Sequence, residues 1–199
     1  MKKAVQFSRT GVPSEVVELI NMETAPTGDD DALINIEAAA INPSHLLTLS
    51  GVYGVQPELP AVPGAEGIGI IGAVGKNVTN LKVGDRVMIP PYTGTWRQQA
   101  VGKASDIAVT FPSEGDPIQM AMLMANPPTA WLLLKTVVDL KPGDWIIQNA
   151  GNSAVGQYVM LLAKIYGFKT VNVVRREGLG DFIAKAGGDV CALDGPDLG

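Results

Sequence analysis

Hydrophobic residues in roughly the first 110 positions come in short runs that are rich in β-branched side chains. Gly, Pro, Asn and Asp separate these runs, among them "AVQF" (4–7), "VVELI" (16–20), "ALINIEAAAI" (32–41) and "GIGIIGAVG" (67–75). Short apolar runs closed by turn-forming residues are typical of strands. Their close spacing predicts a β-rich domain built as a barrel or a sandwich.

The pattern changes near residue 116, where helical signals begin. Asp116 with Pro117 suits the start of one helix, and Pro128 suits the start of another. The periodicity then predicts strands over 144–149, 170–175 and 189–193, with helices over 153–166 and 179–186 between them. This βαβαβ order is half of a doubly wound parallel sheet, so the fold class is α/β with a β-rich domain. We therefore expect the chain to be either the N-terminal portion of something longer or a chain cut inside a domain.

Composition and charge narrow the possible partners. The chain of 199 residues is 46% hydrophobic and 18% charged, which is typical of a folded globular protein. Its net charge is −5, and it has no run of lysine or arginine, which argues against nucleic acid or a membrane surface as partner. The N-terminus lacks the pattern of a signal peptide and no stretch suits a membrane span, so we expect a cytoplasmic location.

The single cysteine and single histidine limit metal chemistry. Cys191 has no partner for a disulfide within the chain, and a thiolate-rich zinc site is excluded. The sequence around Cys191, "GDVCALD", favours a small buried residue in a strand over a reactive thiol. His45 follows "INPS" at an expected helix start, which favours a loop or capping role over catalysis. We predict no metal.

The segment from Asn149 to Gly156, "NAGNSAVG", joins the expected strand to the expected helix. The free N–H groups and the dipole of such a helix favour a phosphate, and glycine allows its close approach. Small residues can do part of this work here: Asn152 tolerates unusual backbone angles, and the Ser153 hydroxyl can contact a phosphate. Gly156 stands where close packing of the helix against the strand needs a glycine. An ordinary strand-helix corner is the alternative.

Two arginines close the second strand of this half-sheet. Arg175 and Arg176 stand where an acidic residue binds a ribose 2′-hydroxyl, whereas arginine suits the 2′-phosphate of NADPH. Two solvated arginines are the alternative, and a small shift of register would make Glu177 a ribose ligand. With the preceding turn, the pair predicts NADPH as cofactor.

Several segments together resemble one family. They are "INPSHLLTLSGVYG" (41–54), "GTWRQQAV" (94–101), "ANPPTAW" (125–131) and "QNAGNSAVGQ" (148–157). The chain is similar to the zinc-free medium-chain dehydrogenase/reductases, and within them to the mitochondrial-type 2-enoyl thioester reductases. The resemblance implies a GroES-like β-barrel catalytic domain at 1–115. It also implies the first half of a Rossmann-type NADPH-binding domain at 116–199.

The resemblance also implies roles for individual residues. Tyr53 in "GVYG" takes the place of the catalytic tyrosine, and Asn126 that of an asparagine beside the nicotinamide. The cofactor-binding positions are completed by the pyrophosphate turn, Asn152, Ser153, Ala154 and Val155, and by the 2′-phosphate contacts Arg175 and Arg176. Where zinc-dependent relatives have cysteine and histidine ligands, this chain has Ser44 and Ala65.

The implied activity is reduction of a 2-enoyl thioester, carried by coenzyme A or acyl carrier protein, by a metal-independent enzyme that forms a homodimer at full length. Hydride reaches the β-carbon and a proton the α-carbon, for which a tyrosine hydroxyl is a suitable acid. An NADPH:quinone oxidoreductase of the same superfamily is the alternative, and a non-catalytic NADPH-binding module is the second. Trp96 could line an acyl pocket or pack the barrel.

Overall fold

The computed structural model describes residues 1–25, 27–91 and 93–196. It divides into two compact units, Met1–Met124 and Ala125–Gly199, which are described separately below. The division falls beyond the domain boundary expected after residue 115. Helix α3 (Pro117–Met120) contacts strands of the first unit, so the segment after residue 115 packs with that unit.

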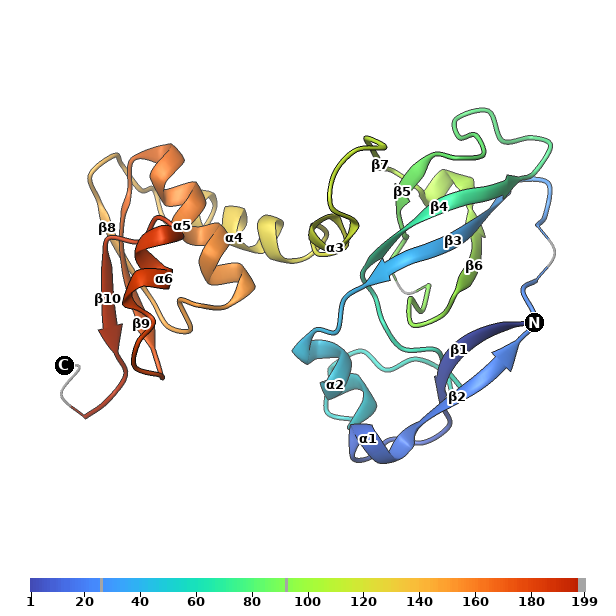
Figure 1. Ribbon diagram of the computed structural model, residues 1–199, viewed down its shortest axis with the longest axis horizontal. Coiled ribbons are helices and arrows are strands. Elements are labelled where there is room, and N and C mark those ends of the chain that lie inside the picture. Colours follow the sequence, from blue (N-terminus) through green and yellow to red (C-terminus); the bar gives the residue numbers. More distant parts are fainter. Residues whose placement is uncertain (26, 92, 197–199) are drawn as a thin grey trace. The chain divides into compact units, whose positions relative to one another are not determined.

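The first unit consists mainly of antiparallel strands (Figure 1). Its sheet has the order β6-β3-β4-β5-β7, and β1 and β2 form a separate two-stranded ribbon. Besides α3, its elements are β1 (Lys2–Phe7), α1 (Pro13–Val16), β2 (Val17–Met22), β3 (Asp31–Ala39), α2 (Pro43–Leu49), β4 (Gly67–Val74), β5 (Arg86–Met88), β6 (Gln99–Lys103), η1 (Ala104–Asp106) and β7 (Thr110–Phe111). The expected β-rich domain is confirmed.

Buried and less buried side chains alternate along the central strand β3, and the buried ones contribute to the main core of this unit. Ala32 and Ile34 are fully buried, and Ile34 pairs in register with Ile71 of β4. Side chains at every second position point to the same face of a strand, so one face of β3 fills the interior. A second cluster beneath the ribbon contains Phe7 and Leu49, with Trp96 packed against it.

The second unit has a three-stranded parallel sheet of order β10-β9-β8 with helices beside it (Figure 1). Its elements are α4 (Asn126–Lys135), β8 (Trp145–Gln148), α5 (Ala154–Tyr166), β9 (Lys169–Val174), α6 (Gly180–Lys185) and β10 (Val190–Leu193). The predicted βαβαβ order is confirmed, with each boundary within two residues of its expected place. Gly167, with φ of 77°, ends α5 in the left-handed conformation that glycine favours.

The buried face of α5 runs through Gly156, Val159, Met160 and Ala163. These positions follow the 3.6-residue period of a helix. Ile165, in contrast, is 65% exposed. It follows Ala163 by two residues, which places it on the opposite side of the helix, so its side chain turns to solvent.

Two local expectations were wrong. Cys191 is exposed rather than buried, because it lies in the edge strand β10 on the same strand face as the exposed Leu193. Helix α4 begins at Asn126, before the proline pair, and not at Pro128. Prolines fit the first helical turn because the N–H groups there have no partner within the helix.

Among the described residues, no helix combines the length and the hydrophobicity needed to cross a bilayer.

Candidate functional site

The turn that follows β8 is built by local hydrogen bonds and one bond to the neighbouring strand. The Gly151 N–H donates to the carbonyl of Val173 in β9 at 3.0 Å, and the Ser153 N–H donates to the carbonyl of Ala150 at 2.8 Å. Ala150 has φ of 48°, a left-handed conformation rare for a residue with a side chain. Unusual backbone angles were expected at Asn152, but the structure places them at Ala150. The turn is thus fixed against the end of β9.

Both glycines of this segment stand where a side chain would collide. A Cβ atom on Gly151 would lie 2.7 Å from Cβ of Asn172. A Cβ atom on Gly156 would lie 2.5 Å from the carbonyl oxygen of Gly151 and 2.9 Å from that of Ala150. Close packing of the helix against the strand was expected at Gly156, and the structure shows that the close contact is with the turn instead. The helix therefore starts directly against the turn, as a phosphate-binding corner requires.

The N-terminus of α5 offers free donors. Ser153 is its N-cap, and the Ser153 Oγ accepts a hydrogen bond from the Gly156 N–H at 3.1 Å. The hydroxyl proton of Ser153 stays available to a ligand. No described residue accepts from the N–H groups of Ala154 and Val155. These donors and the helix dipole favour an anion at this point.

A buried network of polar side chains in the parallel sheet supports the turn. Asn172 is fully buried, and its Nδ2 donates to Thr170 Oγ1 at 2.9 Å and to the Val190 carbonyl at 3.1 Å. Gln148 Nε2 donates to Asn172 Oδ1 at 2.7 Å and to the Gly156 carbonyl at 3.1 Å. Sequence reasoning missed this network. The one available signal was a polar residue amid the valines of "TVNVV".

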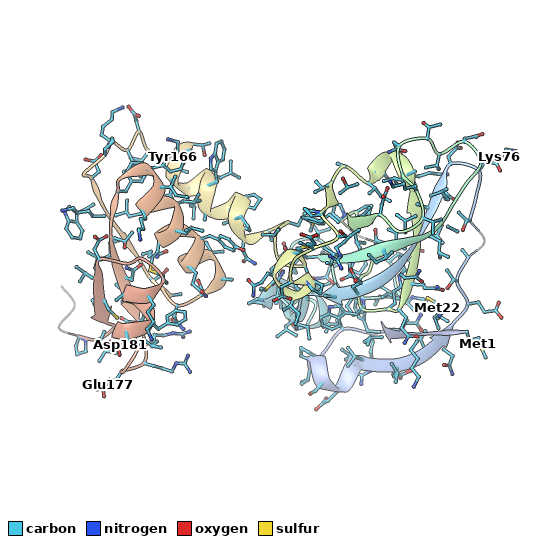
Figure 2. All side chains as sticks on the ribbon, turned by 45° about the horizontal axis from the view of Figure 1, so that its top comes forward. Met1, Met22, Lys76, Tyr166, Glu177 and Asp181 are labelled. Atoms are coloured by element: carbon cyan, nitrogen blue, oxygen red, sulfur yellow. The ribbon has the colours of Figure 1, made fainter. Side chains whose placement is uncertain are left out.

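Arg175 and Arg176 directly follow β9, and both are exposed. Neither forms an ion pair with any residue that the structure describes. Figure 2 labels Glu177, the next residue, in the same loop. Because the turn binds Val173 and β8 runs parallel to β9, the arginines and the turn lie at the same edge of the sheet. The arrangement offers a cationic pair beside a helix N-terminus.

In the first unit, His45 acts at the start of α2. Its Nδ1 accepts a hydrogen bond from the Asn42 N–H at 3.1 Å, and its ring meets Trp96 edge-on at 5.9 Å between centroids. The ring is buried, which lowers the pKa of His45 below its ordinary value. The expected capping role of His45 is confirmed.

Glu66 is a second residue that sequence reasoning missed. Its side chain is 1% exposed, its Oε2 accepts from Asn42 Nδ2 at 2.7 Å, and its Oε1 accepts from the Met124 N–H at 3.0 Å. A buried carboxylate needs such donors, because burial without them costs several kcal/mol. Glu66 therefore fixes the chain at Met124, the last residue of the first unit.

Tyr53 lies in the turn after α2 and is 42% exposed. Its backbone is held on both sides: its N–H donates to the Leu47 carbonyl at 3.2 Å, and its carbonyl accepts from Gln56 Nε2 at 2.8 Å. No described residue shares a hydrogen bond with its hydroxyl. The turn thus holds the tyrosine in place and leaves its hydroxyl accessible.

Trp96 has the packing role that was one of its two expected roles, and its place in an acyl pocket stays a prediction. Its Nε1 donates to the Ala40 carbonyl at 3.0 Å, and its ring packs against the cluster beneath the ribbon. It also lines a hollow of about 370 Å³ together with Ile41 and Thr95. Trp96 therefore packs against this cluster and also forms part of the wall of this hollow.

The structure brings the expected cofactor residues of the turn and the arginine pair to one edge of the second unit. Asn126, the first residue of α4, belongs to the same unit and is half-buried. Tyr53 belongs to the first unit. The roles of these residues remain predictions. Within the described parts of the chain, no three His, Cys, Asp or Glu side chains gather as a metal site would need.

Comparison with known proteins supports the sequence analysis. Residues 28–115 match the family of the alcohol dehydrogenase GroES-like domain. A human mitochondrial enoyl-[acyl-carrier-protein] reductase is 45% identical over 175 residues, which are 87% of this chain and 46% of that protein. The chain thus spans about half the length of the curated relatives that it matches.

Solved structures of two kinds resemble the fold. The mitochondrial 2-enoyl thioester reductase heterodimer Etr1p/Etr2p from Candida tropicalis is 30% identical, with a TM-score of 0.86 over 96% of this chain and 60% of that chain. The complex of Etr1p with NADP and crotonyl-CoA gives 29% and 0.86, over 96% and 60%. A quinone oxidoreductase from Pseudomonas syringae gives 31% and 0.85, over 96% and 58%. Residues 28–115 thus match the GroES-like domain of alcohol dehydrogenases, and the chain as a whole resembles the enoyl thioester and quinone reductases among the medium-chain dehydrogenase/reductases.

Proposed function

We propose that the turn from Asn149 to Gly156 binds the pyrophosphate of NADPH. The residues present fit such a group: the glycines keep side chains out of the corner, and the N–H groups of Ala154 and Val155 lack acceptors among the described residues. Asn152 and Ser153 add polar side chains to the same turn. A pyrophosphate would accept from these donors at the positive end of the helix dipole.

Arg175 and Arg176 would hold the 2′-phosphate. Both are exposed and without ion pairs among described residues, so binding breaks no existing pair. Guanidinium groups bind phosphate through two parallel hydrogen bonds, which an NADH ribose cannot accept. The pair therefore favours NADPH over NADH. Asn126 would lie on the nicotinamide side, as the resemblance implies.

The reaction that we propose for the full-length protein is the reduction of a 2-enoyl thioester to the saturated thioester. NADPH, when bound, supplies the hydride that forms a new C–H bond at the β-carbon. The double-bond electrons then reside on the α-carbon and the thioester carbonyl, and the α-carbon takes a proton. Tyr53 would donate that proton, since a tyrosine hydroxyl can act as a general acid. Solvent restores the hydroxyl.

The observation that carries this proposal is the turn that leads into the N-terminus of α5 and that lacks the usual three glycines. It occurs in a chain that resembles enoyl thioester reductases over 96% of its length. The relative complexed with NADP holds crotonyl-CoA, which identifies the substrate to try first. The test is the rate of NADPH oxidation with crotonyl-CoA beside a simple quinone. Faster turnover of crotonyl-CoA is expected.

A quinone reductase activity is the second candidate, because a quinone oxidoreductase of known structure resembles this chain as closely as the Etr1p complex does. Faster turnover of the quinone would establish it. Tight NADPH binding without turnover of either substrate would instead identify a non-catalytic module.

We also propose that the full-length protein forms a homodimer and takes thioesters of coenzyme A or acyl carrier protein. A related reductase is described as an Etr1p/Etr2p heterodimer, which supports a dimer. Light scattering of the full-length protein measures the mass directly. The expected cytoplasmic location is tested by fractionating cells, since the matched relatives are named as mitochondrial proteins.

A further inference from the structure

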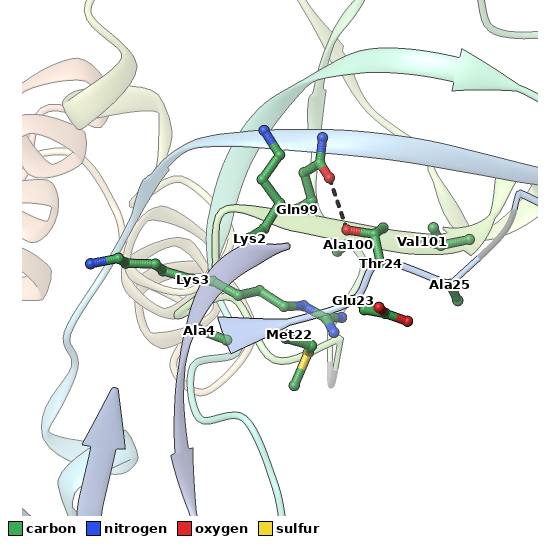
Figure 3. Close-up of a pocket in the computed structure, with 11 residues that line it drawn as sticks. Lys2, Lys3, Ala4, Met22, Glu23, Thr24, Ala25, Gln99, Ala100 and Val101 are labelled. Carbon is green, nitrogen blue, oxygen red and sulfur yellow. Dashed lines mark hydrogen bonds between the residues drawn. The ribbon is translucent and has the colours of Figure 1, made fainter. Parts of the chain in front are cut away.

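A hollow of about 260 Å³ lies in the first unit, between the β1–β2 ribbon and strand β6 (Figure 3). Lys2 and Lys3 line it from β1, and Thr24 lines it just after β2. Arg97 and Gln99 line the opposite side. The Thr24 Oγ1 donates to Gln99 Oε1 at 2.8 Å, the bond drawn dashed in Figure 3, and joins the two walls. The hollow is thus bounded by several elements that hydrogen bonds hold together.

Arg97 is incompletely satisfied in this hollow. Its Nη2 donates to the Thr93 carbonyl at 2.6 Å. Its Nε is sealed from solvent and has no hydrogen-bond partner. Its Nη1 has no partner among the described residues either, but it is not one of the sealed atoms. Nη1 is therefore the part of the guanidinium that a ligand can reach.

No described carboxylate neutralises this arginine. The ion pairs of the described residues join other side chains, and Arg97 has none. Burial lowers the pKa of Arg97 from its ordinary value, as expected for a charge removed from water without a partner. Leaving a cation in this state is unfavourable, because its desolvation is not offset by attraction.

The charge around the hollow is positive. Lys2, Lys3 and Arg97 are the cationic residues of the lining, against the single carboxylate of Glu23, which is exposed. The ammonium group of Lys3 points away from Thr24 and Gln99 (Figure 3). Concave walls that carry one sign of charge concentrate counter-ions. The lining therefore selects for an anion.

We propose that this hollow binds a phosphate group, either as the free ion or as a small phosphate ester. The fork geometry of a guanidinium matches phosphate oxygens, and a lysine adds a second charge. Drug-sized ligands occupy about 300 to 1,000 Å³, so the hollow fits a smaller molecule. The site lies entirely within the first unit and does not rest on the proposed reaction.

The test follows the Arg97 Nε–H resonance by NMR during titration with sodium phosphate, with sodium chloride at equal ionic strength as control. A saturable shift with phosphate alone is expected, together with a rise in Tm that grows with ligand concentration. A second titration uses glycerol 3-phosphate. Tighter binding of the ester identifies an ester as the occupant, and equal binding identifies the free ion.

Variants locate the binding. Arg97→Met should weaken phosphate binding at least about tenfold, because a charged hydrogen bond is lost. Lys2→Gln, at an exposed position that cannot disturb the core, should weaken it about threefold. Lys76→Gln, whose lysine pairs with Asp29 elsewhere, should leave it unchanged. If Arg97→Met does not fold, the phosphate-dependent shift of the wild-type Arg97 Nε–H resonance and the phosphate affinity of Lys2→Gln test the proposal. A shift no larger than with chloride, or wild-type affinity in Lys2→Gln, would overturn the proposal.

Discussion

Replacing Gly156 by Ala tests whether the turn and the helix must be in direct contact. In an open helix this change would stabilise the protein by about 1 kcal/mol, because alanine is the better helix former. Here the new Cβ would lie 2.5 Å from the carbonyl oxygen of Gly151 and 2.9 Å from that of Ala150. Both atoms belong to the backbone, so the turn must move, and overpacking costs about 1 to 3 kcal/mol. We expect a net loss of about 1 kcal/mol.

The same movement displaces the N–H groups of Ala154 and Val155. NADPH affinity should therefore fall at least about tenfold, since each charged hydrogen bond is worth about 1.5 to 3 kcal/mol. The assays are urea unfolding and a fluorescence titration with NADPH. Gly180→Ala is the matched control, because nothing lies within 4 Å of the Cβ it adds. Equal stability and equal NADPH affinity in the two variants would refute the close contact.

Arg175→Ala should lower NADPH affinity by about tenfold or more and leave NADH affinity unchanged; titration with both cofactors shows it, and an equal loss for both would contradict the 2′-phosphate assignment. Asn172→Ala should lower the free energy of unfolding by about 2 to 3 kcal/mol, because the partners of the buried amide lose their hydrogen bonds; a loss under about 0.5 kcal/mol, the size of an ordinary surface change, would contradict this reading. The folded-state pKa of His45 lies below its unfolded value of 6.5, so stability should be lost as the pH falls from that value toward the folded pKa. His45→Asn should remove this dependence in unfolding measured between about pH 5 and 8, the range where histidine titrates, and an unchanged slope would assign it to other groups.

Periodic elements could be predicted from the sequence because their signals are local. The βαβαβ order of the second unit and the left-handed end of α5 at Gly167 both follow from spacing and residue type. The turn before α5 could be recognised as a candidate phosphate site for the same reason. Its residues are consecutive, and a helix N-terminus always presents free donors.

Contacts between distant residues could not be predicted in this way. The bond between Glu66 and Met124 joins positions 58 apart, and the bond between Gln148 and Asn172 joins positions 24 apart. The first bond depends on how the segment before β4 meets the segment after α3, and the second depends on the pairing of β8 with β9. Local sequence patterns do not specify either arrangement. The left-handed residue was misplaced on Asn152 because propensity favours asparagine there, whereas the bond from Gly151 to Val173 fixes the turn so that Ala150 adopts it.

The central claim is that the full-length protein reduces an enoyl thioester with a proton from Tyr53. The most direct measurement is kcat for NADPH oxidation with crotonyl-CoA in the wild type and in Tyr53→Phe, with NADPH affinity measured alongside. The variant keeps the ring of a half-exposed tyrosine whose backbone is held by Leu47 and Gln56, so the fold should persist. We predict that kcat falls by about 10²- to 10⁴-fold at unchanged NADPH affinity. Wild-type kcat in Tyr53→Phe, or no turnover of crotonyl-CoA by the wild type, would contradict the claim.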